Sequence, residues 1–216
     1  RTGSATLGAA GSISVVVGSG DVSLGGRLAA GAGQSTHVTG GSVSIISGFG
    51  TAAHSGAFSL KTANAGDNGV SGYLSFSTGS TAANGSSGHV FFGSGAAAGG
   101  AAGSVSVVVG EGSAAQGGRL SVSAGASTSL TGGAVSVISG CGRATSSGAF
   151  SIRTADSDTD GVSGSLSFSS GTASKGSSGA ITLRSGVAAL GSGGSVSVSV
   201  GTGAVAQGGR VTVSSG

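Results

Sequence analysis

The acidic segment Asp156-Ser157-Asp158-Thr159-Asp160-Gly161 holds the residues whose types and spacing best suit metal chemistry. The D-x-D-x-D-G spacing can bring three carboxylates onto a hard cation around a glycine turn, which makes Asp156, Asp158 and Asp160 a candidate calcium site. A helix–loop–helix calcium site also needs a bidentate glutamate at its twelfth position, and that position is Ser167. The alternative is a solvated corner, since aspartate is an ordinary turn former.

Histidine and serine form no comparable constellation. His37, His54 and His89 stand singly in the sequence, so we do not expect them to share the ligand geometry of a metal site. Serine is abundant, yet no histidine and aspartate are arranged to activate one as a nucleophile. The glycine-rich stretches lack the helix N-terminus that completes a phosphate-binding loop. We therefore expect no enzyme activity, and no cofactor apart from the candidate calcium.

Two single residues bear on the compartment of the chain. Asn84 begins an N-x-S pattern with Gly85 and Ser86, which makes it a candidate N-glycosylation site at an exposed corner. Cys141 is the one cysteine, so an intrachain disulfide is unavailable and the redox compartment stays open. The glycosylation pattern favours a secreted or cell-surface glycoprotein.

Composition limits the elements that could position these residues. The 216 residues include 49 glycines and no proline, and only 7% are charged, so an ordinary globular domain is a poor fit. Glycine and serine at this level usually form flexible linkers, because small side chains bury too little apolar surface to offset lost conformational entropy. Collagen is excluded, because it needs glycine at every third residue and abundant proline. The scattered Lys and Arg give no nucleic-acid footprint, and no signal peptide or membrane span is visible.

A repeat of 15 or 16 residues distinguishes the chain from a linker. Each unit starts at a glycine, which we number position one, and successive starts lie 15 residues apart with three spacings of 16. The fourteen starting glycines are Gly11, Gly26, Gly41, Gly56, Gly72, Gly88, Gly103, Gly118, Gly133, Gly148, Gly164, Gly179, Gly194 and Gly209.

Large apolar residues recur at positions three and five of the unit. Position three is apolar in every unit, and position five is apolar in every unit, with Ala30 the smallest. Position four between them is Ser or Thr except at Ala29 and Phe91. Such alternation with period two is typical of a half-buried strand. A disordered linker has no reason to keep this register.

These features predict an all-β fold, a β-solenoid in which each unit is one coil. Fifteen residues are too few for a strand and a helix, and glycines at positions one and eight would supply the positive φ angles of tight corners. Equivalent strands would pair from coil to coil at about 4.8 Å. Because positions three and five would face mainly Ala, Gly and Ser, we expect about 14 flattened coils, each with two sheets.

A longer period of six units is superimposed on the short one. Gly26-Arg27-Leu28 recurs as Gly118-Arg119-Leu120 and as Gly209-Arg210-Val211, which gives a super-repeat of 91 or 92 residues. We expect residues 1–216 to form a single continuous solenoid segment. Neither end carries a capping sequence, and uncapped strand edges invite aggregation, so we expect this segment to be part of a longer array.

Apolar residues that would point outward from the coils predict lateral contacts between molecules. Four of them occupy position six, and an aromatic pair lies near them on the same predicted face, beside His89. Exposed apolar stripes of this kind mark association surfaces. The candidate contact residues are Val16, Ile46, Tyr73, Phe91, Val108 and Ile138.

Units of the type G-S-V-S-V-x-V-G and G-G-x-L-S-V-S-x-G run through nearly the whole chain. In this respect the sequence resembles the Gly/Ser-rich β-solenoid repeats of large surface proteins of algae and related protists. The resemblance implies a secreted structural role in a cell covering, flagellar hair, adhesive or matrix filament, with self-association into filaments or bundles and no catalytic residues. It also implies that glycans could be attached.

Two other functions remain as alternatives to a structural fibre. An ice-binding solenoid also uses short coils with a flat ladder of hydroxyl side chains, but its face usually presents paired threonines, whereas only Thr182 and Thr212 occupy position four here. An adhesive stalk with a separate tip for specificity would need no further feature in these residues.

Overall fold

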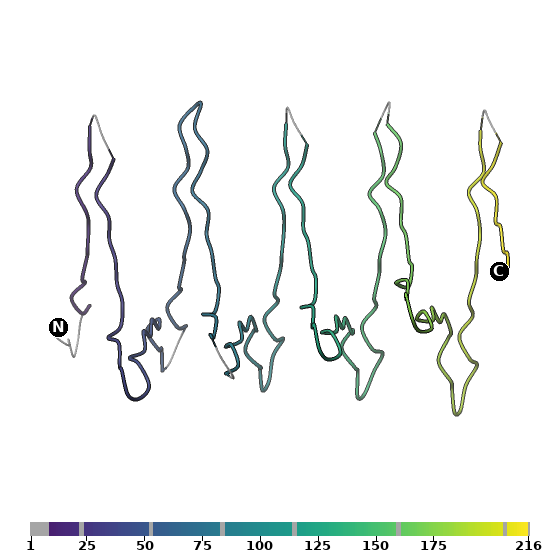
Figure 1. Ribbon diagram of the computed structural model, residues 1–216, viewed down its shortest axis with the longest axis horizontal. Helices are drawn as coiled ribbons and strands as arrows, with labels where there is room; N and C mark the ends of the chain where they lie inside the picture. Colours follow the sequence, from purple (N-terminus) through teal and green to yellow (C-terminus); the bar gives the residue numbers. More distant parts are fainter. Residues whose placement is uncertain are drawn as a thin grey trace. The chain divides into compact units, whose positions relative to one another are not determined.

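The computed structural model of the chain describes residues 9–21, 24–51, 54–82, 85–113, 116–158, 161–204 and 207–215. The chain divides into two compact units, Arg1–Val108 and Val109–Gly216, each of which spans about one super-repeat. Throughout the described ranges the backbone forms neither a helix nor a strand, and the ribbon runs as irregular extended segments joined by loops (Figure 1).

Each sequence unit consists of an extended segment and a loop. The segment covers positions one to seven, and the loop runs from position eight to the glycine that starts the next unit. The backbone bends at position eleven in most units, for example at residues 36–38, 98–100, 128–130 and 174–176. The backbone therefore repeats with the same 15-residue period as the sequence, but the feature that repeats is a bend and not a strand.

The predicted β-solenoid is wrong for this structure, because equivalent segments are not joined by a ladder of hydrogen bonds. Among described residues, seven of the eight backbone hydrogen bonds close a single loop, from the amide of position one to the carbonyl of the preceding position eight. The remaining bond, from Gly69 N to Gly66 O, closes a turn. A folded domain usually has about one internal hydrogen bond per residue. The two-sheet coil and the stacked strands are therefore absent from the described chain.

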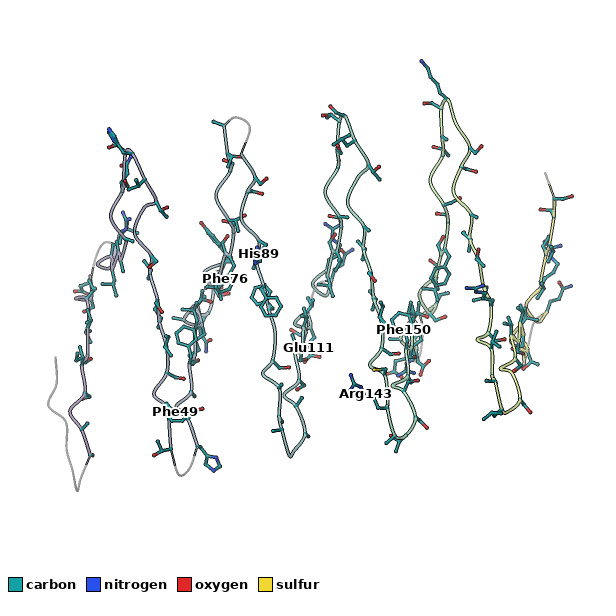
Figure 2. All side chains as sticks on the ribbon, turned by 90° about the horizontal axis from the view of Figure 1, so that it is seen from below. Phe49, Phe76, His89, Glu111, Arg143 and Phe150 are labelled. Carbon is teal, nitrogen blue, oxygen red and sulfur yellow. The ribbon has the colours of Figure 1, made fainter. Side chains whose placement is uncertain are left out.

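The predicted core is also missing from the described residues, since none of them is buried. The chain exposes 21243 Å² of surface. A folded monomer of 19.4 kDa should expose only about 8500 Å² and its extended chain about 28000 Å². Figure 2 shows the side chains, Glu111 and Arg143 among them, standing along an open trace.

The physical reason lies in the residues that would have to face positions three and five. Positions eight to fourteen consist mostly of Gly, Ser, Ala and Thr, which offer almost no apolar surface for a second wall. Closing a loop over eight residues costs less entropy than ordering many glycine-rich units against one another. Local loop closure therefore forms, while the long-range pairing does not.

Glycine also has a different role from the one predicted. No described glycine has a positive φ, so positions one and eight do not act as left-handed corners. The chain turns instead at position eleven. At position one, glycine instead leaves room for a close neighbour, because it has no side chain.

Candidate functional site

A contact between position seven of one unit and the glycine at position one of the next recurs along the whole described chain. We call this contact the joint. A Cβ atom placed on Gly41 would lie 3.2 Å from Ala32 Cβ, and one placed on Gly194 would lie 3.2 Å from Ser185 Cβ. The same pairing joins Gly133 to Ala124, at 3.3 Å. At these three joints an added side chain would press on its neighbour, whereas at Gly148 and Gly179 an added Cβ would lie at ordinary contact distance.

Position seven holds four of the six half-buried residues in the described ranges. Ser47, Thr62, Ser139 and Thr154 all occupy it, and all four are half-buried. Larger residues there are partly covered too, since Val17 and Val109 are each 39% exposed. The joint is therefore the nearest equivalent of a core that the described residues contain.

Backbone hydrogen bonds divide the joints into two classes. Seven loops have an amide of position one bonded to the glycine carbonyl at position eight over 2.8 to 3.4 Å, and we call these bonded loops. They are the loops 18–26, 33–41, 48–56, 110–118, 125–133, 140–148 and 201–209. Both ends of the six other loops are also described. These loops keep the contact of the joint but lack this hydrogen bond, and we call them open loops. Blocks of three bonded loops alternate with blocks of three open loops, which reproduces the six-unit super-repeat in the backbone.

Loop length and the residue at position seven vary together. The three 16-residue units are those that carry threonine at position seven, namely Thr62, Thr78 and Thr154. Their Cγ2 atoms lie 3.3 to 3.5 Å from the Cβ position of the next starting glycine. The extra residue therefore enters the loop, and the larger threonine side chain keeps the joint in contact.

The candidate calcium site gains no support from the described part of the acidic segment. Asp160 lies outside the described residues, while Asp156 and Asp158 are exposed. Within the described ranges, no group of three or more His, Cys, Asp or Glu side chains is close enough to hold a metal. His37 contacts its neighbour instead, with its Nδ1 2.7 Å from the hydroxyl of Thr36.

The other candidate sites are single exposed positions. Asn84, the candidate glycosylation site, falls outside the described residues. Cys141 is an exposed free thiol in a bonded loop. No pocket is found in the described structure, and within the same ranges no helix is long and apolar enough to cross a bilayer.

The six candidate lateral-contact residues are among the most exposed side chains of the extended segments. They are between 81% and 90% exposed, whereas the apolar residues at position three lie between 49% and 73%. These values leave lateral contact as a prediction, and they make the four apolar residues at position six more exposed than those at position three. The residues are Val16, Ile46, Tyr73, Phe91, Val108 and Ile138.

One aromatic contact joins equivalent positions of neighbouring units. Phe76 and Phe92 both occupy position five, and their ring centroids lie 6.1 Å apart at an interplanar angle of 81°. Edge-to-face geometry of this kind is favourable for aromatic pairs. The register of the repeat can thus bring apolar side chains together even without a sheet.

The joint was missed when the sequence was considered alone, although a signal for it was present. The signal is the restriction of threonine at position seven to 16-residue units, together with glycine at every position one. No family model, curated protein or solved structure matches the chain, so the internal repeat is the only comparison that the chain offers.

Proposed function

We propose that the chain is a secreted structural protein whose repeated apolar residues associate with further copies in an extracellular filament or surface layer. The observation that carries this proposal is the exposure of the apolar residues at positions three and five of all fourteen units, together with those at position six of four units. The chain needs no active site for this role.

The area of exposed surface supports association over a long contact. The chain exposes roughly 12000 Å² more than a folded protein of its mass would. An ordinary protein–protein interface buries only about 1200 to 2000 Å² in total. A single small partner would leave most of this surface in water, whereas an extended contact between repeats can cover it.

The repeat itself supports a second copy as the partner. Each apolar position recurs at the same spacing in every copy, so one contact can be repeated along the chain with the same geometry. Only 7% of the residues are charged, and the formal net charge is +3, so repulsion between copies is weak. Serine at position four can meanwhile keep its hydroxyl in water or bond it across the contact.

Sedimentation velocity over a range of protein concentrations tests the proposal. The wild-type chain should shift from monomers to larger species as the concentration rises. A variant with Val16, Ile46, Val108 and Ile138 replaced by Ser should associate at least a hundredfold more weakly, because each fully buried Val or Ile contributes about 1.5 to 3 kcal/mol.

A matched control replaces four exposed apolar residues of the loops, Leu24, Val38, Val70 and Val187, by Ser. These residues do not share one position of the unit, so their loss should leave association nearly unchanged. A wild-type chain that remains monomeric at all concentrations would contradict the proposal. Electron microscopy of the native material should show filaments or layers.

A further inference from the structure

Opposite charges are segregated between the loops and the extended segments. All five described acidic residues lie in loops, at positions nine to twelve of their units: Asp21, Asp67, Glu111, Asp156 and Asp158. Six of the eight described basic residues lie in the extended segments, at position two or six: Arg27, Lys61, Arg119, Arg153, Arg184 and Arg210. All of these side chains are exposed.

The acidic residues also recur with a fixed period along the chain. They occur in the first loop, 18–26, and in every third loop after it as far as 155–164, namely 63–72, 110–118 and 155–164, whereas the next loop of that series, 201–209, has none. The two remaining basic residues, Arg143 and Lys175, lie in loops without an acidic residue. Acidic loops are therefore separated by two loops that are neutral or basic.

Basic residues of the segments follow the six-unit super-repeat. Arg27, Arg119 and Arg210 occupy position two of equivalent units, and Lys61 and Arg153 occupy position six of equivalent units. Opposite charges on two copies thus share the six-unit interval, because acidic loops and basic residues both recur six units apart. This arrangement is the pattern that a second copy of the same chain could use.

We infer that copies of this chain dock with the acidic loops of one copy against the basic segments of another, and that this pairing fixes the register of assembly. The inference rests on the proposed self-association, and it adds the charged surfaces through which one copy recognises another. Positions three and five are apolar in every unit, so contact at these positions does little to distinguish one unit from the next, and the apolar residues at position six mark only four units. Charge complementarity supplies that distinction, since its main effects are on specificity and register.

Removing the acidic charges tests the inference against a matched control. The neutral variant carries Asp21→Asn, Asp67→Asn, Glu111→Gln, Asp156→Asn and Asp158→Asn, which raises the net charge from +3 to +8. The control keeps every acidic residue and reaches the same net charge by replacing the position-fourteen residues Thr39, Thr131, Ser146, Ser177 and Gln207 with Lys. In low salt, the neutral variant should associate on the order of tenfold or more weakly than the control.

Charge reversal and mixing give a second, independent readout. One variant replaces the same five acidic residues by Lys, and the other replaces Arg27, Lys61, Arg119, Arg153 and Arg210 by Glu. Each variant alone should remain largely dissociated in low salt, and an equimolar mixture should form mixed assemblies. Added salt at 0.5 M should weaken the mixed assemblies, because exposed charges are screened within a few ångströms at high ionic strength.

The outcomes separate this inference from the proposed function. If the wild-type chain associates and the neutral variant associates equally well, charge pairing is overturned while self-association stands. If the control is weakened as much as the neutral variant, net charge and not the acidic loops controls assembly, and the inference fails. If the wild-type chain stays monomeric, self-association itself is refuted, and mixed assemblies of the reversed variants would show only that the charges can pair.

Discussion

At the scale of single residues, the joint between position seven and position one accounts for the placement of glycine. The side chains at position seven come within about van der Waals distance of where a Cβ would stand on the next starting glycine. Most other glycines, such as Gly31 and Gly125, have open space in that direction. An added Cβ would therefore be crowded at many of the position-one glycines, Gly41 among them, and would meet nothing at many glycines elsewhere in the unit.

Replacing Gly41 with alanine should open its loop. The new methyl group would meet Ala32 Cβ at 3.2 Å and the backbone of Gly33, which would weaken the 2.8 Å bond from the amide of residue 41 to Gly33 O. A hydrogen bond of this type contributes about 0.5 to 1.5 kcal/mol, so amide exchange at residue 41 should accelerate about two- to tenfold.

The equivalent joint at Gly133 provides an internal reference for that measurement, because its loop is unchanged. Gly31→Ala is the matched control, since nothing lies within 4 Å of the added methyl group. Faster exchange at residue 41 in both variants would mean that general loss of glycine flexibility, and not the joint, controls the loop.

At the scale of the loop, a serine at position ten holds the bend that follows it. The amide of Val38 donates to Ser35 Oγ over 3.1 Å, and the amide of Leu130 donates to Ser127 Oγ over 3.0 Å. The two serines are 92 residues apart and occupy the same place in the super-repeat. Side chains of this kind commonly satisfy backbone amides in turns, so the bend is specified by sequence.

Ser35→Ala should loosen the bend at residues 36–38 without affecting the bend at residues 128–130. The amide of Val38 loses its acceptor, so its exchange should accelerate several-fold, in line with a loss of about 1 kcal/mol. Ser35→Thr keeps the hydroxyl and should restore protection. Equal exchange at Val38 in the wild type and in Ser35→Ala would show that the bend does not depend on the side chain.

At the scale of the whole chain, local loop closure does not amount to a cooperative fold. The described residues include no buried apolar side chain, and their backbone bonds are confined to single loops and one turn. Burial of apolar surface is the main source of folding free energy, so an isolated chain of this kind gains little from becoming ordered. In the proposed filament, association with further copies would supply the burial that the described residues lack.

Thermal stability should therefore depend strongly on protein concentration. A dilute solution of the chain should show no cooperative thermal transition by circular dichroism. Concentrated solutions should show a transition whose midpoint rises with concentration, because association stabilises the ordered state by mass action. A sharp transition with the same midpoint at every concentration would indicate a fold that is complete within one chain.

The sequence predicted the period of the structure correctly and its long-range pairing incorrectly. The glycine repeat and the six-unit super-repeat have counterparts in the backbone, whereas the second strand predicted after position eight is a loop in the described residues. Alternation at positions three to five predicted strands, but alternation identifies only which face could be buried. Burial of that face also needs apolar side chains opposite it, and the loop residues that would have to provide them are too small.

The candidate metal site gains no support for a similar reason, because spacing alone does not bring side chains together. Spacing predicted that Asp156 and Asp158 converge on a cation with Asp160. Convergence needs a folded loop that holds the carboxylates together, and the loop 155–164 has no backbone bond between its two ends. The joint, by contrast, depends only on residues nine or ten apart. Local contacts of this kind can be read from one sequence by comparing its own repeats.

Tolerance of an added residue at the joint makes the loops suitable for carrying foreign sequence. Thr62 and Gly72 stay in contact across ten residues, while Ala32 and Gly41 do so across nine, so the two ends of a loop meet at both of these lengths. A short epitope or a metal-binding peptide could be grafted between the two ends of a loop. Each loop chosen for grafting would then display one copy of the peptide. Material assembled from such chains would present the graft at regular intervals, set by the repeat and not by chemical coupling.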